Sequence, residues 1–255
     1  MSPQIYYIET DIIDACNLNC AGCSHFAPLA KCSNEVSLED FTKDVRRIGE
    51  LFPYHFIFRI MGGEPLLHPQ LAEIIQVSRL HLQEARIELV TNGILLKNCS
   101  QELKDIINEN NIFICISNYG LNLDEESLKK DFKHIGLIDR VETMYNISLN
   151  DNPTDSYITN FFTCRDKRIC IYMEKGKLYH CPITAKTRLF DGYFETNWQE
   201  KMVDGIDIYK NDHHTICNFL RTPIMACKYC DLKKQEQTAH KNYVSEKKKE
   251  EWTVQ

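Results

Sequence analysis

Short apolar runs alternate with apolar stripes along the first 150 residues of the chain. The runs are rich in β-branched residues and predict buried strands, at residues 5–13, 56–61, 87–90, 112–116 and 141–145. Between them, apolar side chains recur three and four residues apart and predict helices, at residues 37–52, 71–82, around 103–107 and around 128. Ser37, with Asp40 three residues later, marks the first helix start as a weaker form of a capping box. Repeated strand–helix alternation predicts an α/β fold with a parallel sheet.

The pattern changes at the polar stretch 151–155, and the residues beyond it are rich in cysteine and poorly periodic. Residues 169–174 and 178–179 flank Gly176 and predict a short hairpin. From about residue 238, interleaved lysines and glutamates predict a solvated helix or a frayed end, with a basic interaction tail as the alternative. We therefore expect three parts, over residues 1–150, 151–237 and 238–255.

The composition excludes some classes of protein. The 255 residues suffice for one large or two modest cores. The formal net charge of −6 argues against a general nucleic-acid binder and against binding to an anionic membrane. No apolar run approaches the roughly 20 residues of a membrane span. The first four residues carry no basic region followed by an apolar stretch, so no secretory signal is expected.

The chain contains twelve cysteines. Such a number indicates either disulfides in an oxidising compartment or metal ligands in a reducing one. The spacings Cys-x3-Cys-x2-Cys and Cys-x2-Cys, without an export signal, favour metal ligation. Iron–sulfur clusters are sensitive to oxygen, so we expect a cytoplasmic location.

The first cysteine set directly follows the first predicted strand and consists of Cys16, Cys20 and Cys23. Three thiolates on one loop suit a cubane 4Fe–4S cluster that keeps one iron without a protein ligand. A closed zinc site would need a fourth ligand nearby, and Cys32 is nine residues beyond the loop.

This cysteine motif, followed by Gly62-Gly63-Glu64-Pro65 after the second predicted strand, resembles the radical S-adenosylmethionine (SAM) superfamily. The resemblance implies a partial, open barrel of (β/α)6 type, in which the open iron chelates SAM. It also implies reductive cleavage of SAM to a 5′-deoxyadenosyl radical, which abstracts a hydrogen atom from a substrate. One departure is Gly22, because the residue before the third cysteine is commonly aromatic in the family. Adenine contacts would then come from Leu18 or His25.

The resemblance also implies contacts to SAM beyond the cluster. Gly62 and Gly63 would let the backbone approach the SAM amino group, since they have no Cβ, and Glu64 would orient that group or hold the loop. Asn92 is either a turn former before Gly93 or a polar contact in the barrel mouth. Ser117 and Asn118 end the fourth strand, where they either bind the SAM ribose or carboxylate or simply cap a loop.

A second cysteine set lies in the last hundred residues. Its spacing, Cys164-x11-Gly176-x4-Cys181 closed by a later Cys-x2-Cys, resembles the SPASM/Twitch auxiliary-cluster domains, and the shorter Twitch form fits because no cysteine follows Cys230. The expected ligands of an auxiliary 4Fe–4S cluster are Cys164, Cys181, Cys227 and Cys230, with Cys170 and Cys217 as alternatives. Three ligands only would leave an iron open for substrate, as in the molybdopterin-precursor cyclases. A zinc ribbon is the structural alternative.

Other polar residues have two interpretations each. His213-His214 is interpreted as a polar loop, because adjacent residues rarely bind one ion. His180 would tune the auxiliary cluster or finish a strand. Basic residues near the second set, including Lys186 and Arg188, would hold a phosphate or carboxylate of the substrate or be solvated.

The resulting prediction is a radical SAM enzyme with an α/β partial barrel and a small cysteine-rich Twitch-like domain. Proteins of this length with one Twitch cluster resemble the aminocyclitol dehydrogenases, so we expect oxidation or rearrangement of a sugar, cyclitol or nucleotide-sugar. A ribosomal-peptide modifying enzyme is the alternative, and a zinc-binding interaction protein is a second one. A flavodoxin or ferredoxin would supply electrons, and neither nucleic acid nor membrane is an expected partner.

Overall fold

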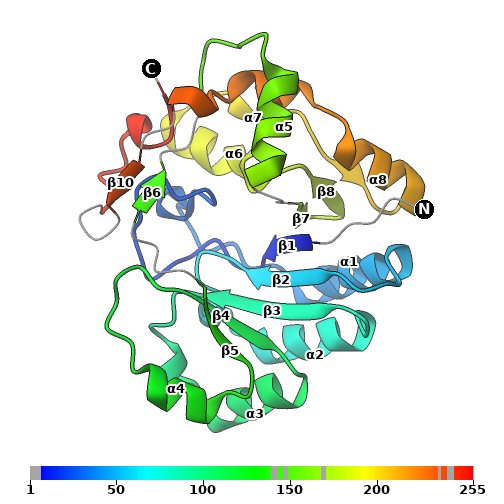
Figure 1. Cartoon of the computed structure of the whole chain (residues 1–255), viewed down its shortest axis with the longest axis vertical. Coiled ribbons are helices and arrows are strands. Elements are labelled where there is room, and N and C mark those ends of the chain that lie inside the picture. The colour runs from blue at the N-terminus through cyan, green and yellow to red at the C-terminus, as the bar shows by residue number, and fades with distance from the viewer. Residues whose placement is uncertain are drawn as a thin grey trace.

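The computed structural model describes residues 7–138, 143–145, 149–167, 171–234, 237–239 and 244–254. Its frame is one eight-stranded sheet with the strand order β5-β4-β3-β2-β1-β7-β8-β9 (Figure 1). The first five strands are β1 (Tyr7–Asp11), β2 (Ile57–Met61), β3 (Arg86–Thr91), β4 (Phe113–Ser117) and β5 (Ile135–Ile138). The helices between them are α1 (Leu38–Leu51), α2 (Leu71–His81), α3 (Gln101–Glu109) and α4 (Glu125–Asp131). The predicted α/β alternation is therefore confirmed.

Strands β1 to β5 are all parallel to their neighbours. One face of this sheet is apolar: Ile8, Phe58 and Ile114 pack with side chains of α1, α2 and α3 in a single core. Helix α1 starts as predicted, because the Ser37 hydroxyl accepts a hydrogen bond from the Asp40 amide at 3.1 Å. The carboxyl ends of the parallel strands therefore meet at one edge, where α/β proteins place their sites.

The opposite face of the sheet is charged. Arg59 of β2 donates from Nε to Glu88 Oε2 at 2.6 Å and from Nη1 to the Tyr7 hydroxyl at 2.9 Å. Tyr7 in turn donates to Glu9 at 2.5 Å. Because successive strand residues point to opposite faces, this polar layer forms the inner wall of the partial barrel.

The second half of the chain extends the same sheet. Strands β7 (Tyr172–Glu174) and β8 (Lys177–Tyr179) form the predicted hairpin around Gly176, whose φ is +70°, and β9 (Ile206–Asp207) pairs with β8. Strand β7 pairs in parallel with β1, with Glu9 opposite Tyr172. The sheet is thus continuous across the boundary expected near residue 151.

The barrel departs from the expected (β/α)6 order. In the described residues, five strands follow one another with four intervening helices, and the sixth parallel strand is β7 at the opposite side of β1. Of the strand expected at 141–145, residues Thr143–Tyr145 form β6, which pairs with β10 (Gln237–Ala239) in a separate two-stranded sheet. Residues 143–145 are therefore diverted from the parallel sheet by an antiparallel partner.

Four helices in the second half were not predicted. They are α5 (Tyr157–Lys167), α6 (Pro182–Phe194), α7 (Trp198–Lys201) and α8 (His213–Arg221). Helix α6 is buried on most sides, so it has no single apolar stripe to recognise. The interpretation of His213-His214 as a loop is wrong: Asp212 accepts from the Thr215 amide at 2.8 Å and caps α8, which begins at His213. None of the described helices is long and apolar enough to cross a membrane.

The C-terminal segment, residues 244–254, packs against the rest of the molecule. Trp252 is fully buried, and the Ser245 amide donates to the Asn19 carbonyl at 2.8 Å. The Val254 amide donates to the Leu149 carbonyl at 2.8 Å. The expected solvated helix or frayed end is therefore wrong for these residues, because one tryptophan among many charges is enough to dock the segment.

Candidate active site

Cys16, Cys20 and Cys23 lie together on the loop that follows β1 at the carboxyl edge of the sheet. Burial, with a smaller contribution from neighbouring thiols of the set, raises the pKa of Cys16 and of Cys20 to about 12. Three converging thiols whose pKa values are raised by burial fit a metal cluster, because a bound cation would stabilise their thiolates. The loop thus brings together all three predicted ligands of a SAM-binding cluster.

The loop conformation explains the glycine before the third cysteine. Gly22 has a φ of +65°, a left-handed conformation that an aromatic residue rarely adopts. The Cys23 carbonyl then accepts hydrogen bonds from the Phe26 amide at 2.9 Å and from the Trp252 indole at 3.0 Å. The C-terminal segment therefore holds the end of the cysteine loop.

Gly62 and Gly63 pack against the root of the cysteine loop. The Gly63 amide donates to the Ile13 carbonyl at 2.9 Å, and the Glu64 amide donates to the Ala15 carbonyl at 2.9 Å. A Cβ at Gly62 would lie 2.6 Å from the Ile13 oxygen, and one at Gly63 would overlap the Ala15 carbonyl. These glycines let two backbone segments approach each other; a contact with SAM remains an expectation.

Glu64 fixes the glycine loop to the next strand. Its side chain is fully buried and accepts hydrogen bonds from the Leu66 amide at 3.2 Å, the Thr91 hydroxyl at 2.7 Å and the Asn92 amide at 3.0 Å. Burial raises the pKa of Glu64, and these donors oppose the rise. Glu64 therefore holds the loop, one of the two roles proposed for it.

Asn92 forms the turn before Gly93 and also contacts the cysteine loop, while its expected contact with SAM stays a prediction. Its Oδ1 accepts from the Ile94 amide at 3.0 Å, which forms the turn, while its Nδ2 donates to Asn17 Oδ1 on the cysteine loop at 2.7 Å. Asn118 caps a loop by accepting from the Leu121 amide at 2.8 Å. These contacts leave the polar ends of β3 and β4 beside the cysteine loop.

Tyr119 is a site residue that sequence reasoning missed. Burial raises the pKa of its hydroxyl, and Cys23, Cys20 and Cys16 raise it further, so this ring lies beside the cysteine loop. A hydrogen bond with Ser117 acts in the opposite direction. An aromatic residue three positions past a predicted strand end was the available signal.

The four cysteines expected to hold an auxiliary cluster line one small cavity of about 40 Å³. They are Cys164, Cys181, Cys227 and Cys230. Burial raises the pKa of Cys181, and Cys230 and Cys164 raise it further, so the thiols face one another. The volume corresponds to about three water molecules, more than one ion requires. In the described part of the chain, no three His, Cys, Asp or Glu side chains stand at the spacing of a single-ion site.

The alternative ligands do not join this cavity in the described structure. Cys217 is buried in the large apolar core, with its Sγ 3.5 Å from His213 Nε2. Cys170 lies outside the described residues. His180 does line the cavity, but its Nδ1 lies 3.0 Å from Asp204 Oδ1 and its Nε2 lies 3.0 Å from the Phe219 carbonyl. His180 therefore joins β8 to α8.

Separate elements deliver the auxiliary cysteines. Cys164 lies on α5, Cys181 is the N-cap of α6, and the last two lie in and just after the 3-10 helix Met225–Tyr229. Asn160 of α5 donates to the carbonyls of Cys227 at 3.1 Å and Cys230 at 2.6 Å. Helix α5 therefore both supplies one thiol and fixes the turn that carries two others.

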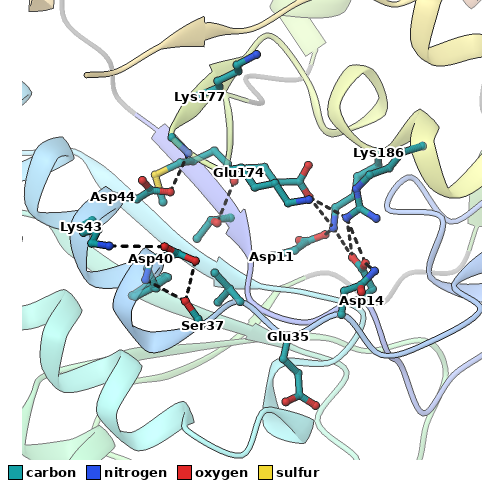
Figure 2. A pocket seen from close by; sticks show the side chains of 18 of the residues that line it. Asp11, Asp14, Glu35, Ser37, Asp40, Lys43, Asp44, Glu174, Lys177 and Lys186 are labelled. Atoms are coloured by element: carbon teal, nitrogen blue, oxygen red, sulfur yellow. Dashed lines mark hydrogen bonds and ion pairs between the residues drawn. The ribbon is translucent and has the colours of Figure 1, made fainter. Parts of the chain in front are cut away.

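A buried group of charges connects α6 with β1. Lys186 Nζ lies 2.6 Å from Asp14 Oδ1, 3.0 Å from Asp11 Oδ2 and 3.5 Å from Glu174 Oε1 (Figure 2). Arg188 also pairs with Asp14 at 3.2 Å and Glu174 at 2.9 Å. We name these five residues the Lys186 cluster. The expectation of solvated basic residues is wrong for Lys186, whose side chain is 2% exposed.

His25 belongs to the edge of this group. Its Nδ1 lies 2.9 Å from Asp11 Oδ2. Burial lowers the pKa of His25, but the charge of Asp11 and its hydrogen bond outweigh burial and raise it. This contact holds the His25 ring against Asp11 of β1. The expected contact of His25 with SAM stays a prediction.

We expect Lys186→Met to destabilise the iron-free protein by about 3–5 kcal/mol, because two buried carboxylates and the partly exposed Glu174 would lose their shared cation. Urea unfolding measures this change. Lys210→Met is the matched control, since Lys210 pairs with Asp207 at 3.2 Å on the surface with its side chain 80% exposed. Equal stability of the two variants would contradict a structural role for Lys186.

The pH dependence of this loss has a definite sign. Burial alone would raise the pKa of Asp11, but His25 and Lys186 lower it below its ordinary 3.8. Burial lowers the pKa of Lys186, but Asp11, Glu174 and Asp14 raise it above 10.5. The ion pair between Asp11 and Lys186 therefore stabilises the fold fully between about pH 4 and pH 10. The stability difference between the parent and Lys186→Met should shrink as the pH falls below about 4.

Residues 10–148 match the sequence profile of the Radical SAM superfamily. The chain belongs to this superfamily. Membership implies an enzyme with a 4Fe–4S cluster and SAM as cofactors, and the Cys16–Cys20–Cys23 loop has the thiols for that cluster.

Two curated relatives each match less than half of this radical SAM protein. GTP 3′,8-cyclase of Microcystis aeruginosa is 35% identical over 104 residues, which are 39% of this chain and 31% of that protein. The 7,8-dihydro-6-hydroxymethylpterin dimethyltransferase of Methanocaldococcus jannaschii is 33% identical over 88 residues, 34% of this chain and 17% of that protein. The matched part thus spans a third or less of each of these two relatives' length.

The fold of this radical SAM protein is similar to a solved structure over most of both chains. The crystal structure of BtrN in complex with AdoMet and 2-DOIA aligns with a TM-score of 0.53 and 13% sequence identity, covering 91% of this chain and 94% of BtrN. At this identity the similarity concerns the fold alone.

Proposed function

We propose that this chain is a radical SAM enzyme that abstracts a hydrogen atom from a small polar substrate and holds a second, auxiliary 4Fe–4S cluster. The observation that carries the proposal is the convergence of two cysteine sets on one framework. Cys181 is the N-cap of helix α6, and Lys186 of this helix contacts Asp14, two residues before Cys16. Helix α6 therefore connects the two proposed cluster sites.

Cys16, Cys20 and Cys23 would hold the SAM-binding cluster, and Cys164, Cys181, Cys227 and Cys230 the auxiliary one. When bound, the cluster and SAM would supply the 5′-deoxyadenosyl radical. The protein itself would bind and orient the substrate and exclude side reactions. Through the hydrogen bonds described above, Glu64 and Asn92 would hold the glycine turn and the cysteine loop in place around SAM. The Twitch-type domain at residues 151–237 is part of this proposal, with a flavodoxin or ferredoxin as electron donor.

A sugar, cyclitol or nucleotide-sugar is the proposed substrate class. The whole-chain fold similarity to BtrN, solved with 2-DOIA, and the sequence similarity to proteins named GTP 3′,8-cyclase both support a small polar substrate over a structural zinc protein. A nucleotide is the second candidate, favoured by those cyclases. The ribosomal-peptide alternative is tested by measuring 5′-deoxyadenosine formation with peptides in place of small molecules.

Anaerobic reconstitution tests the two cluster sites. We expect about eight irons in the parent, four per cluster, and 5′-deoxyadenosine on addition of SAM and dithionite. Cys227→Ala should retain about four irons, whereas Cys217→Ala, whose thiol lies in the apolar core, should retain about eight. Loss of iron from Cys217→Ala, but not from Cys227→Ala, would overturn the ligand assignment. Bound zinc without cleavage of SAM would overturn the proposed reaction.

A further inference from the structure

A cavity of about 530 Å³ opens beyond the carboxyl ends of β1 and β7 (Figure 2). Its walls come from the first turns of α1, the tip of the β7–β8 hairpin, the ends of β1 and the basic residues of α6. The volume lies within the range of small-molecule sites. Neither the described cysteines nor the Gly62–Gly63–Glu64 turn lines it, so it is separate from both cluster sites.

The position of this cavity in the sheet is typical of ligand sites. Met173 of β7 packs in the apolar core shared with α1, whereas the next residue, Glu174, pairs with Lys186 and Arg188 of α6. Since successive residues point to opposite faces, α1 and α6 lie on opposite sides of the sheet here. In open α/β sheets, ligands bind in the crevice that opens outside the strand carboxyl ends between such helices.

Two buried polar atoms of residues lining the cavity have no hydrogen-bond partner. Asp11 Oδ1 is one, on a side chain only 1% exposed, and Arg188 Nε is the other. Asp11 Oδ2 and Arg188 Nη2 are engaged in the Lys186 cluster. Both unpaired atoms are closed to a water molecule, so a ligand in the cavity would reach them only after a side-chain shift.

The charge of the cavity walls favours one class of ligand. Seven carboxylates and five lysine or arginine side chains line the cavity, which leaves a net charge of −2. Gly176, at the hairpin tip, has its amide bound to Asp44, and Tyr209 donates to the same carboxylate at 2.6 Å, so this acidic wall is fixed in place. Acceptors in excess favour a ligand rich in donors and disfavour an anion.

We propose that this cavity is a binding site for a small hydroxylated amine, separate from the SAM site. The amine and the hydroxyl groups of the ligand face the carboxylates of the lining. Because the second oxygen of Asp11 contacts His25, the bound molecule adjoins the loop that ends in Cys23. The proposal rests on the cavity alone and does not require the proposed radical reaction.

Calorimetric titration of the anaerobic holoenzyme with three hexoses tests the charge preference. Glucosamine, glucose and glucuronate share a ring and carry a positive, no and a negative charge at pH 7. We expect glucosamine to bind with a millimolar or lower Kd, at least tenfold more tightly than glucuronate, with glucose between them. Failure of glucosamine to bind at 20 mM, or equal binding of glucuronate, would overturn the proposal.

Two neighbouring residues of α1 provide matched variants, which avoids disturbing the buried Asp11. Asp40 lines the cavity and Glu39 does not, and both side chains are mostly exposed, at 72% and 79%. Asp40→Asn should weaken glucosamine binding at least threefold, and Glu39→Gln should leave it unchanged. The opposite pattern would place the molecule elsewhere and overturn the site.

A SAM competition experiment separates this site from the catalytic one. Glucosamine should bind with the same Kd in the presence and absence of saturating SAM. Competition between the two would assign the molecule to the SAM site and overturn the proposal. Failure of the protein to cleave SAM would count against the proposed reaction and would leave the three-hexose result unchanged.

Discussion

Replacing Gly63 by alanine is expected to prevent assembly of the SAM-binding cluster. A Cβ at this position would overlap the Ala15 carbonyl and lie 2.7 Å from the Asp14 carbonyl oxygen. Both neighbours are backbone atoms, which cannot move aside as a flexible side chain can. The two segments must separate, and the hydrogen bonds from Gly63 to Ile13 and from Glu64 to Ala15 would be lost.

The expected magnitude follows from these losses. Overpacking at a tight contact costs about 1–3 kcal/mol, and each lost backbone hydrogen bond adds about 1 kcal/mol. We therefore expect Gly63→Ala to lose about 3–5 kcal/mol of unfolding free energy and to retain iron only at the proposed auxiliary site after reconstitution. Urea unfolding and iron counting measure both effects.

Gly192→Ala is the control for this substitution. Gly192 lies in α6, and a Cβ there would meet no atom within 4 Å. Alanine is the better helix former by about 1 kcal/mol, so the control should be as stable as the parent or more so, with unchanged iron. Normal iron content in Gly63→Ala would show that the cysteine loop does not depend on this backbone contact.

Replacing Trp252 by alanine is expected to have an effect of similar size. The Trp252 indole is fully buried, packs against Phe26 with ring centroids 6.3 Å apart, and donates to the Cys23 carbonyl. Removal of a buried tryptophan costs about 3–5 kcal/mol. We expect reduced occupancy of the SAM-binding cluster, because the end of the cysteine loop would lose its support.

Trp252→Phe separates packing from hydrogen bonding. It keeps most of the buried ring and loses one hydrogen bond, so a loss of about 1 kcal/mol is expected. The exposed neighbour Glu250 provides the control, and Glu250→Gln should match the parent in unfolding free energy and iron content. If Trp252→Ala loaded iron as readily as Glu250→Gln, the C-terminal segment would have no role in holding the loop.

Local sequence signals predicted the elements that depend on neighbours along the chain. The β-branched runs around Ile8 and Ile114, and the Ser37 cap, act within a few residues, so their patterns are visible in the sequence. The spacing of Cys16, Cys20 and Cys23 reflects a loop of eight residues and is equally local. For this reason the barrel half was predictable.

The rest depends on contacts between distant residues. Lys186 is buried only because Asp14, 172 positions earlier, lies beside it, and no local pattern distinguishes it from a solvated lysine. Trp252 docks against a loop more than two hundred residues away, as its hydrogen bond to Cys23 shows. The two glycines after β2 were recognised by motif, but their contact with the backbone at Ile13 and Ala15 is visible only in the fold.

The pairing of β7 with β1 has a consequence for how the protein is made. Thr10 and Met173, which are 163 positions apart, share a hydrogen bond, so one edge of β1 lacks its partner until most of the chain has left the ribosome. Long-range pairing of this kind folds slowly, and an open strand edge invites association with other chains. Trp252, which supports the end of the cysteine loop, is synthesised later still. We therefore expect iron to enter the cysteine loop only after Trp252 has been synthesised, and the yield of active protein to depend on chaperones during that delay.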